Sequence, residues 1–455
     1  MNLPQPFIEK MTALLGEEAA LFFATYDDEK ASGLRINPLK ISTEEFLNKF
    51  SFPLEPVPFV TGGYYYDPEV IQPGKHPFHQ AGLYYIQEPS AMFVAETLSP
   101  KPGEKVLDLS AAPGGKATHL AGVMGNEGLL IANEIHPKRV KALSENIERF
   151  GITNALVTNE TPERLAKHFA GYFDKILVDA PCSGEGMFRK DPVAIDFWSP
   201  DHVNSCAAQQ GDILASAYEM LKEGGVLVYS TCTFSPEENE RAIEAFMEKH
   251  PDLELLPIDK QAGIASGRSE WTQTGKHDVE LTARLWPHRL RGEGHFTAKL
   301  RKKGASKPWS GKVARGNATK QQLADYRSFE KQALTTTIER DIVAFKQQLY
   351  ALPDDCPDFQ GLKVVRPGLH LGELKKNRFE PNHALAQALP AEHGKASVSL
   401  DLNGDDWRKY LKGETLQTGG DRGWMLVTIE GYPLGWGKEA KGILKNFYPK
   451  GLRIV

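Results

Sequence analysis

The chain has 455 residues, 41% of them hydrophobic and 25% charged, with a formal net charge of −5 and a mean hydropathy of −0.39. This balance predicts a globular protein of two or three domains, and the acidic net charge argues against a chain that coats nucleic acid indiscriminately. No apolar run is long enough to span a bilayer, and the first residues lack the pattern of a secretory signal. We therefore expect a cytoplasmic protein without a membrane partner. We also expect the protein to be monomeric.

The four cysteines are scattered along the chain, at Cys182, Cys206, Cys232 and Cys356. None of them forms a C-x-x-C pair, so we expect neither a zinc site nor a disulfide framework, and no other metal. In a cytoplasmic protein such residues are free thiols. The question is therefore which of them lies in a reactive position.

Residues 1–95 combine helical patterns with a stretch that is rich in proline and glycine. The helical patterns cover Phe7–Leu15 and Glu17–Tyr26, and the Pro/Gly-rich stretch is Phe52–Phe78. Residues 96–300 alternate short apolar strands with amphipathic helices, which predicts an α/β domain with a doubly wound parallel sheet. The expected strands are Lys105–Ser110, Gly128–Asn133, Ala155–Thr158, Lys175–Asp179 and Gly225–Ser230, and the expected helices are Ala117–Met124, Pro137–Phe150, Val203–Leu221 and Pro236–Glu248.

The composition changes after Pro287. Between Arg284 and Lys320 there are eleven lysines or arginines but one acid, Glu293. Residues 301–358 are expected to form a basic linker, with a Gly/Ser/Lys-rich arm over Lys302–Asn317, followed by a helical segment over Gln321–Phe345. Residues 359–455 form a smaller domain that closes with strands and turns in Trp424–Glu430 and Tyr432–Tyr448.

The segment Val106–Ala117 has the pattern of a strand, a glycine turn and a helix start. Glycines there let the backbone approach a ligand closely, and Glu134, twenty residues past Gly114, is placed to accept both hydroxyls of a ribose. The G-x-G-x-x-G pattern of dinucleotide sites is missing, and so is the G-x-x-x-x-G-K-[ST] pattern of nucleotide triphosphate sites. S-adenosyl-L-methionine, which has a ribose and no phosphate, fits this turn; the alternative is a tight turn that binds nothing.

Two cysteines follow the ends of two predicted strands. Cys182 follows Asp179-Ala-Pro, and Cys232 follows Ser230-Thr. Because ligands of open α/β sheets bind at the carboxyl ends of strands, both thiols should open into the crevice that holds the cofactor. A single such cysteine is usually a small buried hydrophobic residue, but two of them beside an acid favour a reactive site.

The chemistry that needs this set of groups is methylation of carbon 5 of cytosine. A thiolate that adds to carbon 6 makes carbon 5 nucleophilic, and it can later leave. Asp179 is placed to donate or share a proton at ring nitrogen 3, and Lys116 could hold an anion or lower the pKa of a thiol. The strand-end pattern does not decide which cysteine is the nucleophile.

These motifs together resemble the Nop/Sun family of RNA cytosine-5 methyltransferases. The matching segments are Ala111–Ala117, Asp179–Met187, Tyr229–Asn239, Arg35–Leu39, Tyr85–Ser90 and Arg284–His288. The later segments Gly368–Lys376 and Phe379–Pro381 are similar to the bacterial rRNA branch of that family, the RsmF type. The resemblance covers most of the chain and implies a Rossmann-like class I methyltransferase core, with an N-terminal RNA-binding region and a C-terminal PUA-like α+β domain.

The resemblance also implies the role of each site residue. In this family the cysteine after Ser-Thr forms the covalent bond, so Cys232 is the expected nucleophile and Cys182 assists product release, with Asp179 and Lys116 as further catalytic residues. The substrate would be rRNA, in free form or within a ribosomal subunit; alternatives are a tRNA substrate or a non-catalytic RNA-binding assembly factor. The expected S-adenosyl-L-methionine contacts are Ala111, Ala112, Pro113, Gly114, Gly115, Lys116, Ala117, Glu134, Arg139, Thr161 and Asp179.

One position departs from the family pattern. Relatives tend to have an Asp that meets the adenine amino group, and the corresponding position here is Thr161. The adenine contact could therefore come from Thr161, from Asn159 or from backbone groups alone.

RNA contacts have less specific signals. The basic segment Arg284–Lys320 could contact phosphates or be a solvated linker, and Arg189-Lys190 is a second candidate for phosphate contact. In the last domain Trp424, Trp436 and Tyr448 lie near lysines 438, 441 and 445 in the sequence. These aromatic residues fit a hydrophobic core better than a platform for stacked bases.

Overall fold

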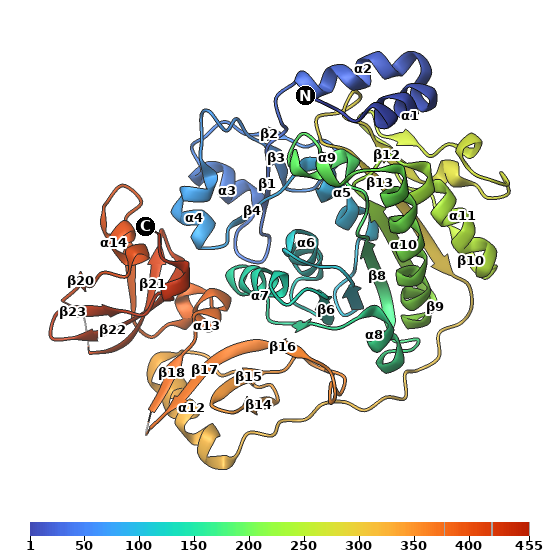
Figure 1. The fold of residues 1–455 in the computed structure, drawn as a ribbon. Coiled ribbons are helices and arrows are strands. Elements are labelled where there is room, and N and C mark those ends of the chain that lie inside the picture. Colours follow the sequence, from blue (N-terminus) through green and yellow to red (C-terminus); the bar gives the residue numbers. More distant parts are fainter. Residues whose placement is uncertain (377, 420–421, 455) are drawn as a thin grey trace.

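The structure is a computed structural model that describes residues 1–376, 378–419 and 422–454. Its first region pairs a helical hairpin with a small antiparallel sheet (Figure 1). The hairpin is closed by Phe7 and Phe22, which pack edge to face against Phe188 and Phe234 of the central domain. The sheet has the strand order β2-β3-β1-β4. The elements of this region are α1 (Gln5–Leu15), α2 (Ala19–Ala24), β1 (Gly33–Ile36), α3 (Thr43–Lys49), β2 (Glu55–Pro56), β3 (Gly63–Tyr65), α4 (Pro77–Gln80), β4 (Tyr84–Ile86) and α5 (Pro89–Leu98).

The central domain is built on one mixed sheet with the order β11-β12-β13-β9-β8-β5-β6-β7-β16. The five strands from β7 to β9 in this order are parallel, and β13 and β16 flank them in antiparallel orientation. The strands are β5 (Lys105–Asp108), β6 (Leu129–Asn133), β7 (Ala155–Thr158), β8 (Phe173–Asp179), β9 (Leu221–Thr231), β10 (Leu253–Leu255, which pairs with β13), β11 (Ala265–Ser266), β12 (Ala283–Leu285), β13 (His295–Lys302) and β16 (Val364–Pro367). The expected doubly wound Rossmann-like α/β fold is confirmed.

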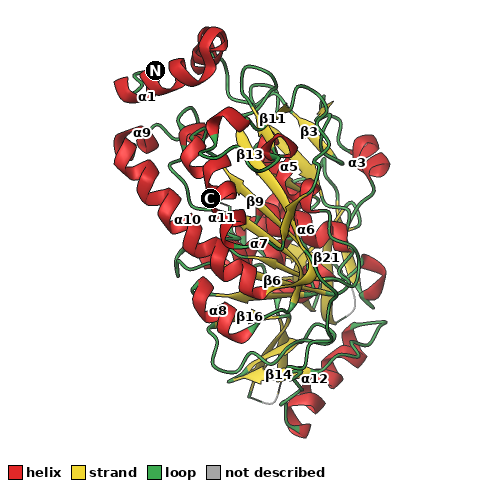
Figure 2. Cartoon of the chain, turned by 90° about the vertical axis from the view of Figure 1, so that its right-hand side faces the viewer, coloured by secondary structure: helices red, strands yellow, loops and turns green. Residues whose placement is uncertain are grey.

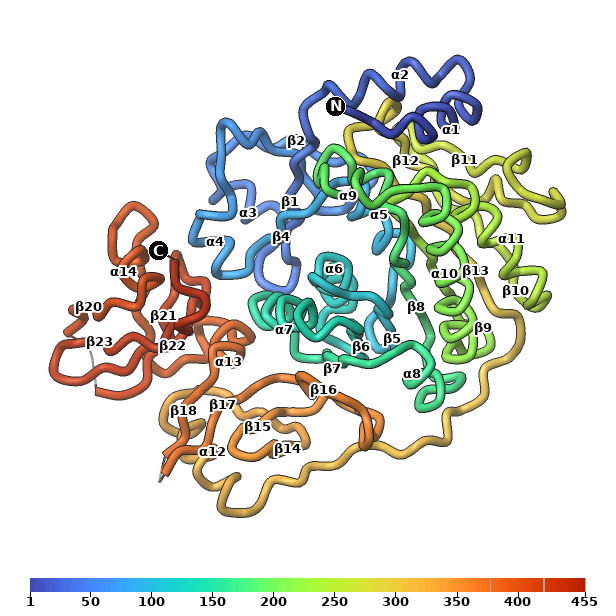
Figure 3. Tube along the Cα trace, in the orientation of Figure 1, coloured from blue at the N-terminus to red at the C-terminus, as the bar shows by residue number. Residues whose placement is uncertain are grey.

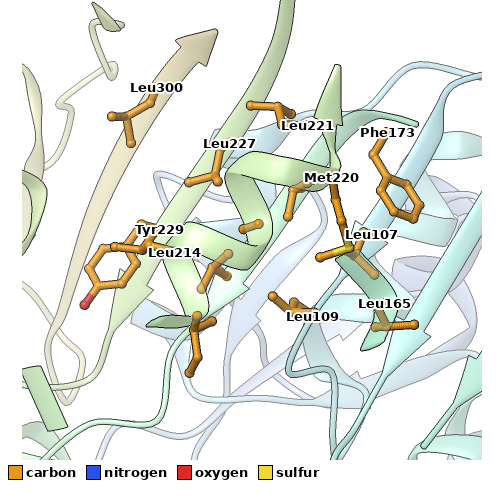
Figure 4. Close-up of a cluster of buried hydrophobic side chains, with 14 of the residues drawn as sticks. Leu107, Leu109, Leu165, Phe173, Leu214, Met220, Leu221, Leu227, Tyr229 and Leu300 are labelled. Carbon is orange, nitrogen blue, oxygen red and sulfur yellow. The ribbon is translucent and has the colours of Figure 1, made fainter. Parts of the chain in front are cut away.

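Helices cover both faces of this sheet (Figure 2). On one face, Leu214 and Met220 of α10 pack on Leu107 and Leu227 of the strands (Figure 4). On the other face, Leu120 and Leu143 belong to a second core cluster with the opposite side of the same strands. The helices of the domain are α6 (Gly115–Met124), α7 (Arg139–Arg149), α8 (Pro162–His168), α9 (Val193–Phe197), α10 (Pro200–Met220) and α11 (Glu240–Lys249). The helix α10 begins at Pro200 because the Ser199 side chain accepts a hydrogen bond from the His202 amide.

The first part of the basic segment is a pair of strands. Residues 283–285 and 295–302 form β12 and β13, and β13 extends the central sheet beside β9. Arg284 is buried and donates two hydrogen bonds to Glu240, at 2.7 Å from Nε and 2.5 Å from Nη2. The expectation of a solvent-exposed segment that begins at Arg284 was wrong, because the partner that neutralises this arginine comes from α11.

The segment from 303 to 318 has no helix, and runs along the edge of the molecule from β13 toward α12 (Figure 3). It is anchored rather than a free arm: the Trp309 ring lies 4.6 Å from that of Tyr172, and the Ala314 amide donates to the Cys356 carbonyl at 2.8 Å. The expectation of a mobile arm was wrong, because the Trp309 side chain docks on Tyr172 of the core.

The helical prediction over Gln321–Phe345 was wrong beyond Ala333. The helix α12 (Lys320–Ala333) ends before a run of three threonines, whose branched side chains disfavour a helix. The chain then forms strands that pair with strands beyond residue 358, so one small sheet crosses the expected domain boundary. This sheet contains β14 (Ile342–Phe345), β15 (Gln348–Ala351), β17 (Leu369–Lys375) and β18 (Arg378–Pro381).

The last part of the chain forms another sheet, with the order β19-β21-β22-β23-β20. Trp436 and Tyr448 are buried in its core, as expected, whereas Trp424 is partly buried beneath the ammonium of Lys438, which lies 5.1 Å from the ring centre. The elements are α13 (His383–Ala388), β19 (Ser397–Leu400), α14 (Asp406–Lys412), β20 (Leu416–Gln417), β21 (Gly423–Ile429), β22 (Tyr432–Ala440) and β23 (Ile443–Asn446).

Lys40 connects three regions of the chain. Its side-chain nitrogen donates to the carbonyl oxygens of Ala81 and Arg149 at 2.6 and 2.9 Å, and to Gln387 Oε1 at 2.6 Å. These acceptors belong to the N-terminal region, the central domain and α13. Burial lowers the pKa of Lys40 well below its usual value, so its hydrogen bonds, rather than a charge, connect the C-terminal region with the central domain.

We expect the buried Arg284–Glu240 pair to be much more important for stability than an exposed pair. Arg284→Met leaves the Glu240 carboxylate buried without its cation, which costs about 3–5 kcal/mol. Arg301→Met is the control, because Arg301 and Glu254 are half exposed and such pairs contribute about 1 kcal/mol or less. Differential scanning calorimetry should show a large loss of thermal stability for Arg284→Met, partly recovered on adding Glu240→Gln. Equal losses in the two arginine variants would contradict this interpretation.

Candidate active site

The parallel strands bring their carboxyl ends to one edge of the central sheet. There a cavity of about 730 Å³ extends from the end of β6 to the ends of β8 and β9. Among the predicted site residues, those that line it are Ala112, Glu134, Arg139, Thr161, Asp179, Cys182 and Cys232. The remaining predicted residues, Ala111, Pro113, Gly114, Gly115, Lys116 and Ala117, belong to the turn after β5 and the start of α6.

Cys182 and Cys232 meet inside this cavity. Their sulfur atoms lie 3.2 Å apart, although 50 residues separate them in the sequence. The hydrogen bond between the two thiols and, next, burial of the side chain raise the pKa of Cys182 well above that of a free thiol. Cys182 therefore holds its proton at neutral pH, and the two thiols are not equivalent.

Asp179 forms an ion pair with Lys116 beside the cysteines. Lys116 Nζ lies 2.7 Å from Asp179 Oδ2, and the Ser230 hydroxyl donates to Oδ1 at 2.6 Å. Burial alone would raise the pKa of Asp179, but the charge of Lys116 outweighs it and the pKa falls below its usual value. For Lys116, burial opposes the charged form, yet Asp179 raises the pKa. Asp179 is thus a carboxylate in the free protein, and the proton of the pair is on Lys116.

Lys116 also interacts electrostatically with Cys232. After Asp179 and Asp108, the negative charge of a Cys232 thiolate is a further cause that raises the pKa of Lys116. Lys116 is therefore the cation whose charge reaches Cys232.

Asp108 is a buried acid of the site that the sequence analysis did not select. It ends β5 and is fully buried, and its carboxyl oxygens accept no hydrogen bond of normal geometry within the described residues. Burial and, next, the nearby charge of Asp179 raise its pKa to about 8. Its position at the end of the first strand, directly before the glycine turn, was the signal that could have identified it.

Glu134 and Arg139 hold the other end of the cavity. Glu134 Oε1 accepts a hydrogen bond from the His136 amide at 2.8 Å, and Oε2 lies 3.3 Å from Arg139 Nη1. Arg139 also donates from Nη2 to the Ala112 carbonyl at 2.8 Å, which ties the turn after β5 to α7. Gly114, the residue before α6, has φ +117°, a conformation that favours glycine and allows the tight turn.

The two side chains expected as possible adenine contacts, Thr161 and Asn159, have different surroundings. Thr161 lines the cavity, and its hydroxyl caps α8 by accepting from the Arg164 amide at 3.4 Å. Asn159 Nδ2 instead donates to the carbonyls of Glu134 and Ile135, at 2.7 and 2.9 Å. Thr161 is therefore on the cavity wall, whereas the amide of Asn159 is engaged by backbone.

The proposed phosphate contacts of Arg189 do not fit its position. This side chain is buried and donates to Glu293 and to the carbonyls of Thr25 and Gly292, at 2.7–2.8 Å. The candidacy of Arg189 was wrong, because the N-terminal helices and the loop before β13 cover it, while Lys190 is exposed. Several arginines of the basic segment are likewise paired with acids: Arg284 with Glu240, Arg289 with Glu18, Arg291 with Glu55, Arg301 with Glu254 and Arg315 with Asp341.

Within residues 1–376, 378–419 and 422–454, no group of three or more His, Cys, Asp or Glu side chains is arranged to hold a metal ion. In the same described part of the chain, no helix is both long and apolar enough to cross a membrane.

Family comparisons cover nearly the whole sequence. The sequence model described as "16S rRNA methyltransferase RsmB/F" matches residues 95–301. Three further models, for the N-terminal domain of 16S rRNA methyltransferase RsmF, the RsmF first C-terminal domain and the RsmF PUA domain, match residues 3–89, 328–389 and 397–454.

Individual relatives agree with these matches. The "Ribosomal RNA small subunit methyltransferase F" proteins of Psychromonas ingrahamii and Vibrio campbellii are each 32% identical, over 99% of this chain and 97% of theirs. Among solved structures, a "Methyltransferase Homolog Protein from Pyrococcus Horikoshii" is 33% identical, with a TM-score of 0.58 over 66% of this chain and 95% of that one.

The buried Asp108 should make stability depend on pH. An aspartate has a pKa near 4 in an unfolded chain, and folding raises it to about 8 here, so the folded state binds the proton more tightly. This residue therefore destabilises the fold increasingly as the pH rises from about 4 to about 8. We expect Asp108→Asn to be more stable than the unaltered protein at pH 8, with a smaller difference at pH 5.

Thermal melting at several pH values between 5 and 8 would measure this effect. The exposed Asp28→Asn is the control, and its stability should run parallel to that of the unaltered protein. Parallel curves for Asp108→Asn as well would show that the buried carboxyl does not titrate in this range.

Proposed function

This chain belongs to the RsmB/F family of 16S rRNA methyltransferases, and we propose that it methylates carbon 5 of a cytosine in small-subunit rRNA. The observation that carries the proposal is the pair of sulfur atoms 3.2 Å apart, beside the Lys116–Asp179 ion pair. Transfer to an exocyclic amino group needs no thiol, whereas transfer to a ring carbon needs a nucleophile that activates the ring.

S-adenosyl-L-methionine fits the part of the cavity between β5 and β6. Glu134 Oε2 is buried and accepts no hydrogen bond of normal geometry within the described residues, so it is available to the hydroxyls of a ribose. The turn after β5 and Thr161 would hold the rest of the cofactor, which supplies a methyl group on a positively charged sulfur. The wall contains no phosphate cradle of the P-loop or dinucleotide type, in agreement with a cofactor that lacks phosphate.

Cys232 is the proposed nucleophile. The charge of Lys116 reaches Cys232, whereas Cys182 retains its proton. The sulfur of Cys232 forms a bond with carbon 6 of the cytosine, and the electrons of the C5–C6 double bond make carbon 5 nucleophilic. Negative charge develops at ring nitrogen 3, and this nitrogen receives a proton from Lys116. The Asp179 carboxylate holds Lys116 in place. Of the two expected roles of Asp179, to donate or to share a proton at nitrogen 3, this proposal uses the second: Asp179 shares the proton that Lys116 carries.

Release reverses the addition. The proton on carbon 5 passes to water in the cavity, its bonding electrons restore the C5–C6 double bond, and the C6–S bond breaks with its electrons returning to Cys232. The protonated Cys182 lies within hydrogen-bond distance of the departing sulfur and stabilises the thiolate. Ring nitrogen 3 returns its proton to Lys116. This division gives the two cysteines separate steps.

The substrate must present its base outside a duplex. The sulfur atoms lie in a cavity, so the target cytosine has to be flipped out or single-stranded. The family match and the PUA model at residues 397–454 support rRNA as the substrate. Bisulfite sequencing of rRNA and tRNA from cells with and without the protein tests this: loss of 5-methylcytosine from 16S rRNA alone is expected. Loss from tRNA, or no loss at all, would refute the proposal.

Replacement of Cys232 and replacement of Cys182 should block different steps of the reaction. We expect Cys232→Ala to lose methyl transfer by at least about a thousandfold, because no covalent activation remains. Cys182→Ala should accumulate a protein–RNA adduct, which a denaturing gel detects with RNA labelled at its end. Cys206→Ala, whose thiol lies on α10, is the control and should behave as the unaltered protein. Methylation by Cys232→Ala at the unaltered rate would refute the mechanism.

Glu134 should determine cofactor affinity. Glu134→Gln removes the charge that accepts the ribose hydroxyls and should weaken S-adenosyl-L-methionine binding by about tenfold or more, or roughly 1.5–3 kcal/mol. Isothermal titration calorimetry measures this, with Glu127→Gln, an exposed glutamate near the end of α6, as the control. An unchanged dissociation constant would place the ribose elsewhere.

A further inference from the structure

Glu238 is buried behind the two cysteines, and the mechanism above does not use it. It follows Cys232 by six residues, at the end of a short 3-10 helix (Pro236–Glu238), and its side chain is completely buried. Tyr229 fixes its backbone by donating a hydrogen bond to the Glu238 carbonyl at 2.7 Å. The carboxylate thus lies beneath the segment that carries Cys182.

The Glu238 carboxylate binds the residue that follows Cys182. Oε2 accepts from the Ser183 amide at 2.9 Å, and Oε1 accepts from the Ser183 hydroxyl. Ser183 also exchanges a hydrogen bond with the Thr233 hydroxyl at 2.8 Å, and Thr233 is the residue after Cys232. The network therefore connects the two cysteine-bearing segments.

A second contact reaches the residue before Cys182. Gln210 of α10 donates from Nε2 to Glu238 Oε2 at 2.9 Å and to the Pro181 carbonyl at 3.0 Å. Pro181 and Ser183, which flank Cys182, are therefore both held by one carboxylate, directly or through one amide. Fixing the backbone on both sides of a residue fixes the direction of its side chain, and this is the condition for the 3.2 Å distance between the sulfur atoms.

A charge at this place is costly for folding. The donors to the Glu238 carboxylate are neutral groups, and burial raises its pKa to about 7. A neutral side chain would avoid this penalty, so stability alone does not explain a glutamate here. Its charge also acts on the neighbouring thiol: after Cys232 and burial, Glu238 is a further cause that raises the pKa of Cys182.

We propose that Glu238 is the residue that positions Cys182 against Cys232 for the release of the methylated cytosine. The inference rests on the proposed function. It adds that Glu238 supports Cys182 in the release step and is not needed for the addition step. Glu238 is a positioning residue, because its contacts reach the reacting sulfur only through Pro181, Ser183 and Gln210.

The test compares Glu238→Gln with Glu237→Gln in the full-length protein. Glutamine keeps the size of the side chain but removes the charge and places an amide against donors. Glu237 is the adjacent glutamate, and its carboxylate is instead near Lys10 and Arg241. Methyl transfer to unmodified 16S rRNA and the protein–RNA adduct are followed in single-turnover reactions. Glu238→Gln should form the adduct within about threefold of the unaltered rate but release it about tenfold more slowly, and Glu237→Gln should match the unaltered protein.

The pH profile separates positioning from a purely structural role. Protonation of Glu238 below about pH 7 removes the charge, so release in the unaltered protein should slow as the pH falls through 7. In Glu238→Gln the release rate should lack this step, because nothing titrates at position 238. A profile that keeps the step, or release at the unaltered rate, would overturn the proposal.

Ser183→Ala keeps the test decisive if Glu238→Gln does not fold. This variant removes only the hydroxyl contacts to Glu238 and Thr233, and it should slow release by about threefold with adduct formation retained. Release by Ser183→Ala at the unaltered rate would then refute the positioning role. If the unaltered protein methylates cytosine without any covalent adduct, the proposed mechanism fails first, and this result is distinct from a failure of Glu238.

Discussion

The parallel register of the central sheet is the constraint on which the site depends. Asp108 pairs with Leu177 and Asp179 with Ser230, so the ends of β5, β8 and β9 lie side by side at one edge. Residues that are more than a hundred positions apart in the sequence thereby meet in one cavity. Parallel strands require helical crossovers. One of these helices, α7, also holds the turn after β5, because Arg139 donates a hydrogen bond to the Ala112 carbonyl. The packing of helices on both faces therefore maintains the geometry of the chemistry.

The order of strands and helices in this domain was predictable because each parallel strand is buried on both faces. Such strands appear in the sequence as short apolar runs, and the cysteines that follow them mark the strand ends. The structure of the basic segment Arg284–Lys320 was not predictable in the same way. A count of charges cannot find Glu240, the partner of Arg284, which lies 44 residues away on another element. The end of α12 was missed for a different reason: the three branched threonines after Leu334 disfavour a helix, and the later part of the expected helix pairs as β14 with β15.

Within the site, residue identities were easier to predict than protonation states. Asp179 was selected because it was predicted to end a strand just before Cys182, and it does end β8. Its ionised state follows from the Lys116 ammonium 2.7 Å away, a contact between residues 63 positions apart. Asp108, in contrast, is in the same cluster but lacks a direct cation, so burial keeps its proton in place. One ion pair thus determines which of two neighbouring carboxyl groups carries the charge.

Two thiols 3.2 Å apart can perform different steps only if their surroundings differ. The field across the pair provides this difference: the Lys116 ammonium acts on Cys232, and the Glu238 carboxylate acts on Cys182. A negative charge disfavours a thiolate, so the Glu238 carboxylate helps to keep the proton on Cys182. Glu238 is buried and Lys116 is largely so, and water screens such charges weakly. An exchange of roles between the cysteines would require both groups to move, but the Asp179 carboxylate holds Lys116 and the donors from Ser183 and Gln210 hold Glu238.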